Sequence, residues 1–236
     1  MKKLQTFTFF SLITSISLLL SCSGDDDGAR VIRNGFFPKT ITTTSPGGMA
    51  TIVFNYDTNN RIISFESNDS NVSFEYNEAG LIGQINASDD SENFEVDYNA
   101  GIITQFTEIN TGDVINVDYS DGIYEFLGGT RSFNEDNLLT SFGDTFSVEY
   151  NANPGPFKEL DFQPILFFLG GSEVVRRSYF FSPYELSSFA VPLGGQLECT
   201  TQRDTDDNID LVITSDSGGQ EIYRFEITYV EREITN

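Results

Sequence analysis

The sequence has no histidine, no tryptophan and only two cysteines, Cys22 and Cys199, among its 236 residues. Without histidine, Ser-His-Asp catalysis, Cys-His catalysis and histidine-ligated metal sites are excluded. No glycine-rich phosphate loop stands between an expected strand and an expected helix, so the usual nucleotide-binding motifs are missing too. The sequence therefore predicts no cofactor and assigns no catalytic residue.

Basic residues are also scarce, with 13 Lys and Arg against 36 Asp and Glu and a net charge of −23. Such a surface repels polyanions, so nucleic acid is excluded as a partner and an anionic lipid surface is disfavoured. Two acids suffice for glycosidase chemistry. With 36 acids in the chain, however, the sequence nominates no pair, and solvating surface charge is the better interpretation.

Long apolar runs are missing beyond the N-terminus, since the longest later one, 165–169, is far too short to span a membrane. The N-terminus begins with Lys2 and Lys3 and continues with a mostly apolar segment from Leu4 to Leu20. Its strongly apolar core is shorter than the ~20 residues that a bilayer needs. We therefore predict a secretory signal peptide at 1–21 in preference to a transmembrane anchor.

The run Leu19-Leu20-Ser21-Cys22 resembles the bacterial lipobox, in which a cysteine is lipidated and the chain is cleaved just before it. This resemblance makes Cys22 the lipidation site, the first residue of the mature protein and its link to the membrane. Several acyl chains, at about 0.8 kcal/mol per buried methylene, would hold the protein stably. Removal of Lys2 and Lys3 leaves 11 basic against 36 acidic residues, a net charge of −25.

Three aspartates, Asp25, Asp26 and Asp27, follow directly in the segment 22–30. This segment is too polar to pack and is expected to be a flexible acidic tether. It also resembles the acidic export signal that sends lipoproteins of the Bacteroidota type to the outer face of the outer membrane. We therefore expect a lipid-anchored outer-membrane protein that faces the extracellular side, with a plain solvated linker as the alternative interpretation of the aspartates.

A repeat dominates the mature chain: apolar, any, apolar, any, Tyr, then usually Asp or Asn. Copies end at Tyr56, Tyr76, Tyr98, Tyr119 and Tyr150, a worn copy contains Phe133, and a late copy ends at Tyr229. The period-two alternation is typical of antiparallel strands with one buried face. Residues that tolerate positive φ follow each copy, which indicates a tight turn into a second strand: Asn60, Gly80, Gly101, Gly122 and Asn137.

The stretch Tyr56-Asp57-Thr58-Asn59-Asn60-Arg61-Ile62 resembles the tyrosine-aspartate (YD) repeat of rearrangement-hotspot proteins, whose hairpins stack into long curved sheets. The lipobox and the five hairpins together are similar to small Bacteroidota lipoproteins of an unknown-function family described as having a porin-like fold. This resemblance implies a curved or barrel-like antiparallel sheet and no known activity.

The fold expected is all-β: an antiparallel meander of repeated β-hairpins forming a curved or barrel-like sheet. It occupies a single domain at 31–236, and the tyrosines, in phase with the apolar positions, are expected in its core and not on a sugar-stacking platform. The segment 153–198 breaks the period with prolines and glycine pairs, and is expected to be an irregular insertion or cap.

Two further positions allow alternatives. Asp204, Asp206 and Asn208 have the spacing of calcium ligands, but the sixth position lacks Gly and the twelfth lacks Glu, so a polar turn between strands is preferred. Cys199 alternates with Leu197 and is expected to be a buried small hydrophobe and not a reactive thiol.

The function favoured is a non-enzymatic binding or structural module of the cell surface, with a glycan or a protein as ligand. The alternative is a carboxylate-dependent hydrolase acting on extracellular polysaccharide.

Overall fold

The computed structural model describes residues 32–67, 71–88, 93–127, 129–143, 146–160, 163–168, 182–191 and 195–235. The predicted signal peptide, the lipidation site Cys22 and the export signal Asp25, Asp26 and Asp27 lie outside the described residues. In the part of the chain that is described, no helix has the length and apolar character needed to cross a membrane.

The described residues form strands and one short 3-10 helix. The first half of the chain holds β1 (Ile32–Ser45), β2 (Gly48–Tyr56), β3 (Ile62–Glu66), β4 (Asn71–Tyr76), β5 (Ile82–Ala87), β6 (Phe94–Asn99), β7 (Ile102–Glu108), β8 (Val114–Asn116) and β9 (Asp118–Ser120). The second half holds β10 (Ile123–Phe126), β11 (Gly129–Phe133), β12 (Leu139–Phe142), β13 (Phe146–Pro154), the helix η1 (Pro164–Phe167), β14 (Tyr184–Val191), β15 (Gly195–Arg203), β16 (Ile209–Ser215) and β17 (Glu221–Thr235).

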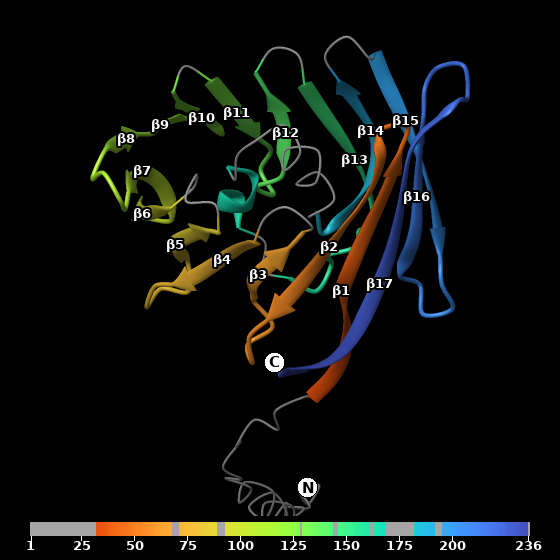
Figure 1. The fold of residues 1–236 in the computed structure, drawn as a ribbon, viewed down its shortest axis with the longest axis horizontal. Coiled ribbons are helices and arrows are strands. Elements are labelled where there is room, and N and C mark those ends of the chain that lie inside the picture. Colours follow the sequence, from red (N-terminus) through yellow and green to blue (C-terminus); the bar gives the residue numbers. More distant parts are fainter. Residues whose placement is uncertain are drawn as a thin grey trace, which may run out of the picture.

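The strands pair antiparallel in sequence order, and β8 and β9 are two pieces of one strand on either side of Val117. The last strand, β17, pairs with β1 along its length, from Ile32 opposite Thr235 to Thr44 opposite Arg224. The meander therefore curves round into a nearly closed, barrel-shaped sheet, with the first and last strands side by side (Figure 1). The predicted fold class is confirmed.

The two faces of the wall differ sharply in polarity. Cross-strand neighbours on the inner face of β2 to β5 are all buried and apolar: Phe54, Phe65, Val72 and Ala87. Neighbours one position along, on the outer face of the same strands, are all polar: Asn55, Ser64, Ser73 and Asn86. Because side chains alternate along a strand, the period-two pattern of the sequence places its apolar set inside the barrel. Most of the protein's hydrophobic stabilisation thus comes from the lumen.

The repeat tyrosines fasten each hairpin to its neighbour. Five phenol hydroxyls donate to a backbone carbonyl oxygen at 2.7 to 3.0 Å, from Tyr56 to Pro38, Tyr76 to Ile62, Tyr98 to Ile82, Tyr150 to Leu139 and Tyr229 to Ile209. The ladder shifts register just before four of them, Tyr56, Tyr76, Tyr98 and Tyr150. Such bulges increase the local twist and bend the strand, which helps the sheet to curve.

Tyr119 departs from the pattern expected for the repeat. Its copy is split at Val117 into β8 and β9, and its side chain is 42% exposed beside the ring of Tyr124. The fourth repeat therefore does not form a continuous strand with a buried tyrosine.

Five turns in the described part of the chain share one construction. In each of them a side-chain oxygen accepts the backbone N–H groups two and four residues later: Asp57, Asn77, Asn134, Asp204 and Asp216. Such side chains stabilise turns by replacing a backbone acceptor. Positive φ occurs at all five positions predicted for it: Asn60, Gly80, Gly101, Gly122 and Asn137.

The described residues between β13 and β14, 155–160 and 163–168, lie in the lumen, and we call them the lumen segment (Figure 1). Phe157 contacts Phe54 of β2, and Phe168, just after η1, packs against rings of β7, β10 and β11. The side chains of Phe157 and Ile165 are at most 1% exposed. The barrel is therefore packed with its own chain over the described residues.

The structure differs here from the expected irregular segment 153–198. Strand β14 and the first residues of β15 fall inside it and form ordinary antiparallel ladders with β13 and β16. The prolines that suggested irregularity stand outside these ladders or at their ends, as Pro154 and Pro183 do. The C-terminal strands β15 and β17 are among the longest in the sheet.

Candidate functional site

A cavity of about 670 Å³ opens at the end of the barrel where β1 begins and β17 ends. We call it the mouth cavity. Its walls come from the β2–β3 turn, the β4–β5 turn, the end of β17 and the lumen segment, and its polar lining consists of Thr58, Asn59, Asn60, Arg61, Glu159, Gln163, Glu233 and Thr235. It is of the size of small-molecule sites.

The side chain of Arg61 is held by two partners, the carboxylate of Asp57 and the ring of Tyr76. Its Nε and Nη2 donate to Oδ2 of Asp57 at 2.8 and 2.6 Å, and its guanidinium lies 4.0 Å from the centre of the Tyr76 ring. Burial raises the pKa of Asp57, but N–H groups of Arg61 and Asn59 and the charge of Arg61 outweigh it and keep this pKa below its usual range. Asp57 is therefore ionised at neutral pH and holds the Arg61 side chain through two hydrogen bonds.

Arg232 of β17 connects the last strand to the same turn. It donates to Oδ1 of Asn60 at 2.7 Å and to the carbonyl oxygen of Asp57 at 2.5 Å. Asn60 in turn donates from Nδ2 to the carbonyl oxygen of Glu233 at 2.8 Å. The side chain of Asn60 thus has a partner at each end, and the turn is fixed to the strand that closes the barrel.

Two contacts fix the lumen segment at the mouth. Arg33 of β1 forms an ion pair with Glu159 at 2.7 Å. Gln163 donates to the carbonyl oxygen of Gly80 at 2.8 Å and accepts the N–H of Ile82 at 2.9 Å, so it takes the place of a strand neighbour for β5. The cavity is therefore bounded by fixed side chains on both sides, which favours preorganised binding.

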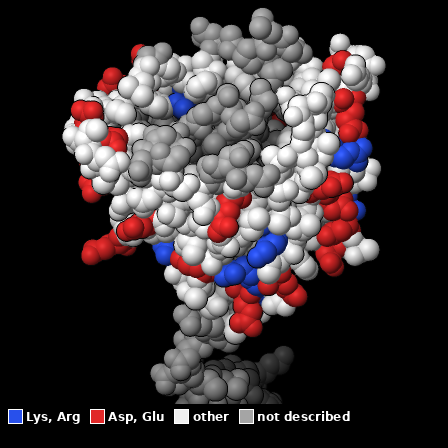
Figure 2. Space-filling view, in the orientation of Figure 1, with Lys and Arg blue, Asp and Glu red and all other residues white. Residues whose placement is uncertain are grey.

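Charges of both signs surround the mouth. Arg33, Arg61 and Arg232 each bind an acid or a polar oxygen, and the acids present are Asp57, Glu159 and Glu233. Figure 2 shows basic and acidic side chains intermixed at this end of the barrel, below the lower ends of the strands, whereas acids predominate along the right-hand wall. The mouth thus has little net charge in an otherwise strongly acidic protein.

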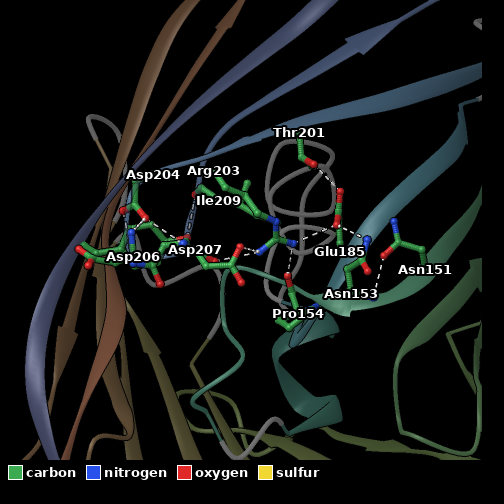
Figure 3. A network of polar contacts seen from close by, with 12 residues as sticks. Asn151, Asn153, Pro154, Glu185, Thr201, Arg203, Asp204, Asp206, Asp207 and Ile209 are labelled. Atoms are coloured by element: carbon green, nitrogen blue, oxygen red, sulfur yellow. Dashed lines mark hydrogen bonds and ion pairs between the residues drawn. The ribbon is translucent and has the colours of Figure 1, made fainter.

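A second polar cluster joins β13, β14 and β15 (Figure 3). Glu185, 7% exposed, accepts hydrogen bonds from Thr201, from Asn153 at 3.0 Å and from Arg203 at 3.0 Å. Arg203 also donates to the carbonyl oxygens of Pro154 and Asp207, at 2.8 and 2.9 Å. The cluster fastens three strands and one turn together.

Glu185 is unsuited to general acid catalysis. Burial raises its pKa, but the hydrogen bonds from Thr201, Asn153 and Arg203 and the charge of Arg203 outweigh it and leave its pKa below the usual range. A general acid at neutral pH needs the opposite shift. This buried carboxylate therefore serves as a hydrogen-bond acceptor that joins the three strands.

The calcium candidates Asp204, Asp206 and Asn208 occupy the β15–β16 turn (Figure 3). Oδ1 of Asp204 accepts the N–H groups of Asp206 and Asn208 at 2.9 Å each, and Oδ2 lies 3.3 Å from Nδ2 of Asn208. These oxygens face donors, where a cation would need them free. Within the described ranges no group of three or more His, Cys, Asp or Glu residues is arranged to hold a metal ion.

Cys199 lies half-buried in β15 against the core. Burial, with smaller effects from Glu198 and Glu185, raises its pKa to about 12. Because the thiolate is the reactive form, this thiol is inert at neutral pH.

The sequence alone did not predict the mouth cavity. Its parts come from the β2–β3 turn, the β4–β5 turn, residues 159–160 and 163–166, and the end of β17, which lie far apart in the chain. One local signal did point to it: only the first repeat turn carries an arginine, Arg61, and this side chain borders the cavity.

The fold and the cavity define a class: an antiparallel barrel filled by its own chain, with a polar cavity at one mouth. No protein-family model matches the sequence, and no curated protein is similar to it. Among solved structures, a porin-like protein from Bacteroides vulgatus is similar, with 12% identity, a TM-score of 0.45, and coverage of 83% of this chain and 99% of that one. A porin-like protein from Bacteroides uniformis, with 12% identity and a TM-score of 0.41, covers 83% of this chain and 96% of its own. Similarity at this level assigns neither a family nor an activity.

Proposed function

We propose that this chain is a lipid-anchored protein of the outer membrane, attached through Cys22, whose barrel stands in water and binds a ligand at its mouth without catalysis. The observation that carries the proposal is a preorganised polar cavity at the end of a barrel whose lumen is otherwise filled. Because side chains fill the lumen, the mouth is the place in the described part of the barrel where a ligand can bind.

The polarity of the wall supports a barrel in water. A membrane-spanning barrel carries an apolar band on its outer face and polar residues inside. Along the cross-strand rows of β2 to β5 the arrangement is reversed, with Asn55, Ser64, Ser73 and Asn86 outside and Phe54, Phe65, Val72 and Ala87 inside. Attachment to the membrane would therefore come from the lipid at Cys22.

Binding is tested by thermal unfolding of the purified barrel, without its anchor, in a library of extracellular peptides, metabolites and oligosaccharides. A ligand should raise Tm with its concentration, because it binds the folded state only. The double substitution Thr58→Ala, Asn59→Ala at the mouth should abolish the shift. If no compound gives a shift that this substitution removes, the barrel is not a binding module of the kind proposed.

Surface display is tested separately on intact cells. Replacement of Asp25, Asp26 and Asp27 by Ala should leave a lipidated protein that added protease no longer reaches. Equal cleavage of the variant and the wild type would reduce the three aspartates to a plain tether.

A further inference from the structure

Several hydrogen-bonding groups at the mouth are left over after the internal contacts are made. The side chains of Thr58 and Asn59 are exposed and form no hydrogen bond with the described residues. Arg61 uses Nε and Nη2 and keeps Nη1, and Gln163 uses one N–H and one lone pair and keeps the others. These groups mix donors with acceptors, and a hydroxyl is a ligand group that both donates and accepts through one atom.

Net charge at the mouth argues against an ionic ligand. A phosphate or carboxylate group would have to displace Asp57 to reach Nε and Nη2 of Arg61, and at Nη1 it would share the cavity with Glu159 and Glu233. A cation would meet Arg61, and Glu159 is already paired with Arg33 at 2.7 Å. Because Arg61 and Glu159 each have an ionic partner within the protein, an uncharged polar ligand enters without breaking either ion pair.

Apolar surface lies beside these polar groups. Leu160, Leu166, Ile62 and Ile82 line the cavity, together with the ring of Tyr76. A purely hydrocarbon ligand would leave the polar groups of the cavity without hydrogen-bond partners, and each such group that it buried would cost binding free energy. The combination suits a ligand with C–H faces and hydroxyl edges.

We propose that the mouth cavity binds the end of an uncharged saccharide chain. The proposal rests on the binding function above and names its ligand class. Hydroxyls would bond to Thr58, Asn59 and the free Nη1 of Arg61, and one sugar face would pack on the apolar side of the cavity. The volume of about 670 Å³ accommodates a chain end and not a long polymer segment. A terminal sugar on a soluble chain and one on a glycolipid offer the same hydroxyls.

The chain provides a matched control. The β15–β16 turn has the same construction as the β2–β3 turn, with Thr205 and Asp206 in the places of Thr58 and Asn59, and it does not line the cavity. Both pairs are exposed, and the turn hydrogen bonds involve their backbone and not their side chains. Thr58→Ala, Asn59→Ala and Thr205→Ala, Asp206→Ala should therefore fold equally well.

The test is calorimetric titration of the wild type and both double variants with neutral gluco-, manno- and xylo-oligosaccharides of two to six units. Uronic-acid oligosaccharides and short peptides serve as other ligand classes, and vesicles carrying a neutral glycolipid separate the two sources of sugar. At least one neutral saccharide should bind, the mouth variant should bind it about tenfold more weakly or worse, and the control variant should match the wild type. Uronic acids should bind more weakly than their neutral counterparts.

Mouth-dependent binding of peptides or uronic acids, without neutral saccharides, overturns the ligand class but keeps the binding function. Equal loss in both variants, or no saccharide binding at all, overturns the proposed site.

Discussion

Tyr98 is the sharpest test of how the barrel wall is built. Its ring packs against the core, and its hydroxyl donates to the carbonyl oxygen of Ile82 at 2.7 Å. Burial raises the pKa of Tyr98, so the phenol stays protonated and remains a donor through neutral pH. The backbone N–H of Ile82 donates to Gln163 of the lumen segment. The hydrogen bond from Tyr98 therefore lies next to the contact that fixes the barrel wall to the lumen segment.

Three substitutions separate the contributions. Tyr98→Ala removes the ring and leaves a cavity, at a cost of about 3 kcal/mol or more of unfolding free energy. Tyr98→Phe keeps the ring and removes the hydrogen bond, at a cost of about 1 kcal/mol. Asp97→Ala lies on the outer face, where the side chain accepts only an exposed contact from Gln105 at 3.1 Å, and should cost no more than about 0.5 kcal/mol.

Urea unfolding of the three variants at pH 7 decides the matter. The midpoints should fall in the order Asp97→Ala, Tyr98→Phe, Tyr98→Ala, with the last clearly lowest against a typical total of roughly 5 to 15 kcal/mol. Near-equal midpoints for Tyr98→Ala and Asp97→Ala would refute the assignment of faces and the register built on it.

Two further predictions concern the mouth turn and the entry of the lumen segment. Ionised Asp57 stabilises the fold above about pH 4, and this contribution is lost as the pH falls through its lowered pKa. Asn replaces Asp in the same turn at Asn77, so Asp57→Asn should unfold with a free energy lower by under about 1 kcal/mol at neutral pH. Urea unfolding across pH should show this gap closing toward about pH 2, and a constant gap would contradict the account. Gly155→Ala would place a Cβ 2.3 Å from the carbonyl oxygen of Tyr184, whereas at Gly47 the nearest atom is 3.7 Å away. Gly155→Ala should cost about 1 to 3 kcal/mol and Gly47→Ala far less, and equal Tm values by calorimetry would rule out this close approach.

The strands and turns of the barrel wall could be predicted from the sequence, because they depend on local residue patterns. Alternation in Phe94-Glu95-Val96-Asp97-Tyr98 matches the observed faces, since a strand turns its side chains over at each residue. The turn residue Asn60 has the positive φ that its place after the tyrosine predicts. The register shift beside Tyr98 was not expected, because its extra residue, Thr104, lies in the partner strand β7, where the buried Ile103 and Phe106 are three residues apart.

The closure of the barrel and the filling of its lumen could not be predicted from local sequence patterns. The pairing of β1 with β17 joins residues nearly the whole chain apart, and no motif marks either strand as the other's partner. The lumen segment has prolines and glycines that suggest a loop, yet Phe157 and Ile165 are almost wholly buried. These apolar side chains become buried only inside a closed sheet. Their contribution to the core therefore depends on the closure of the barrel. The mouth cavity depends on both, which is why its residues could not be nominated beforehand.

The central claim is that the barrel stands in water and that only the lipid on Cys22 attaches it to the membrane. Detergent phase separation of cells producing wild type and Cys22→Ala tests it most directly, with circular dichroism of the purified variant to confirm the fold. The account predicts that the wild type enters the detergent phase and that the folded variant enters the aqueous phase. A folded Cys22→Ala variant that still enters the detergent phase would show that the wall itself contacts lipid, and would contradict the account.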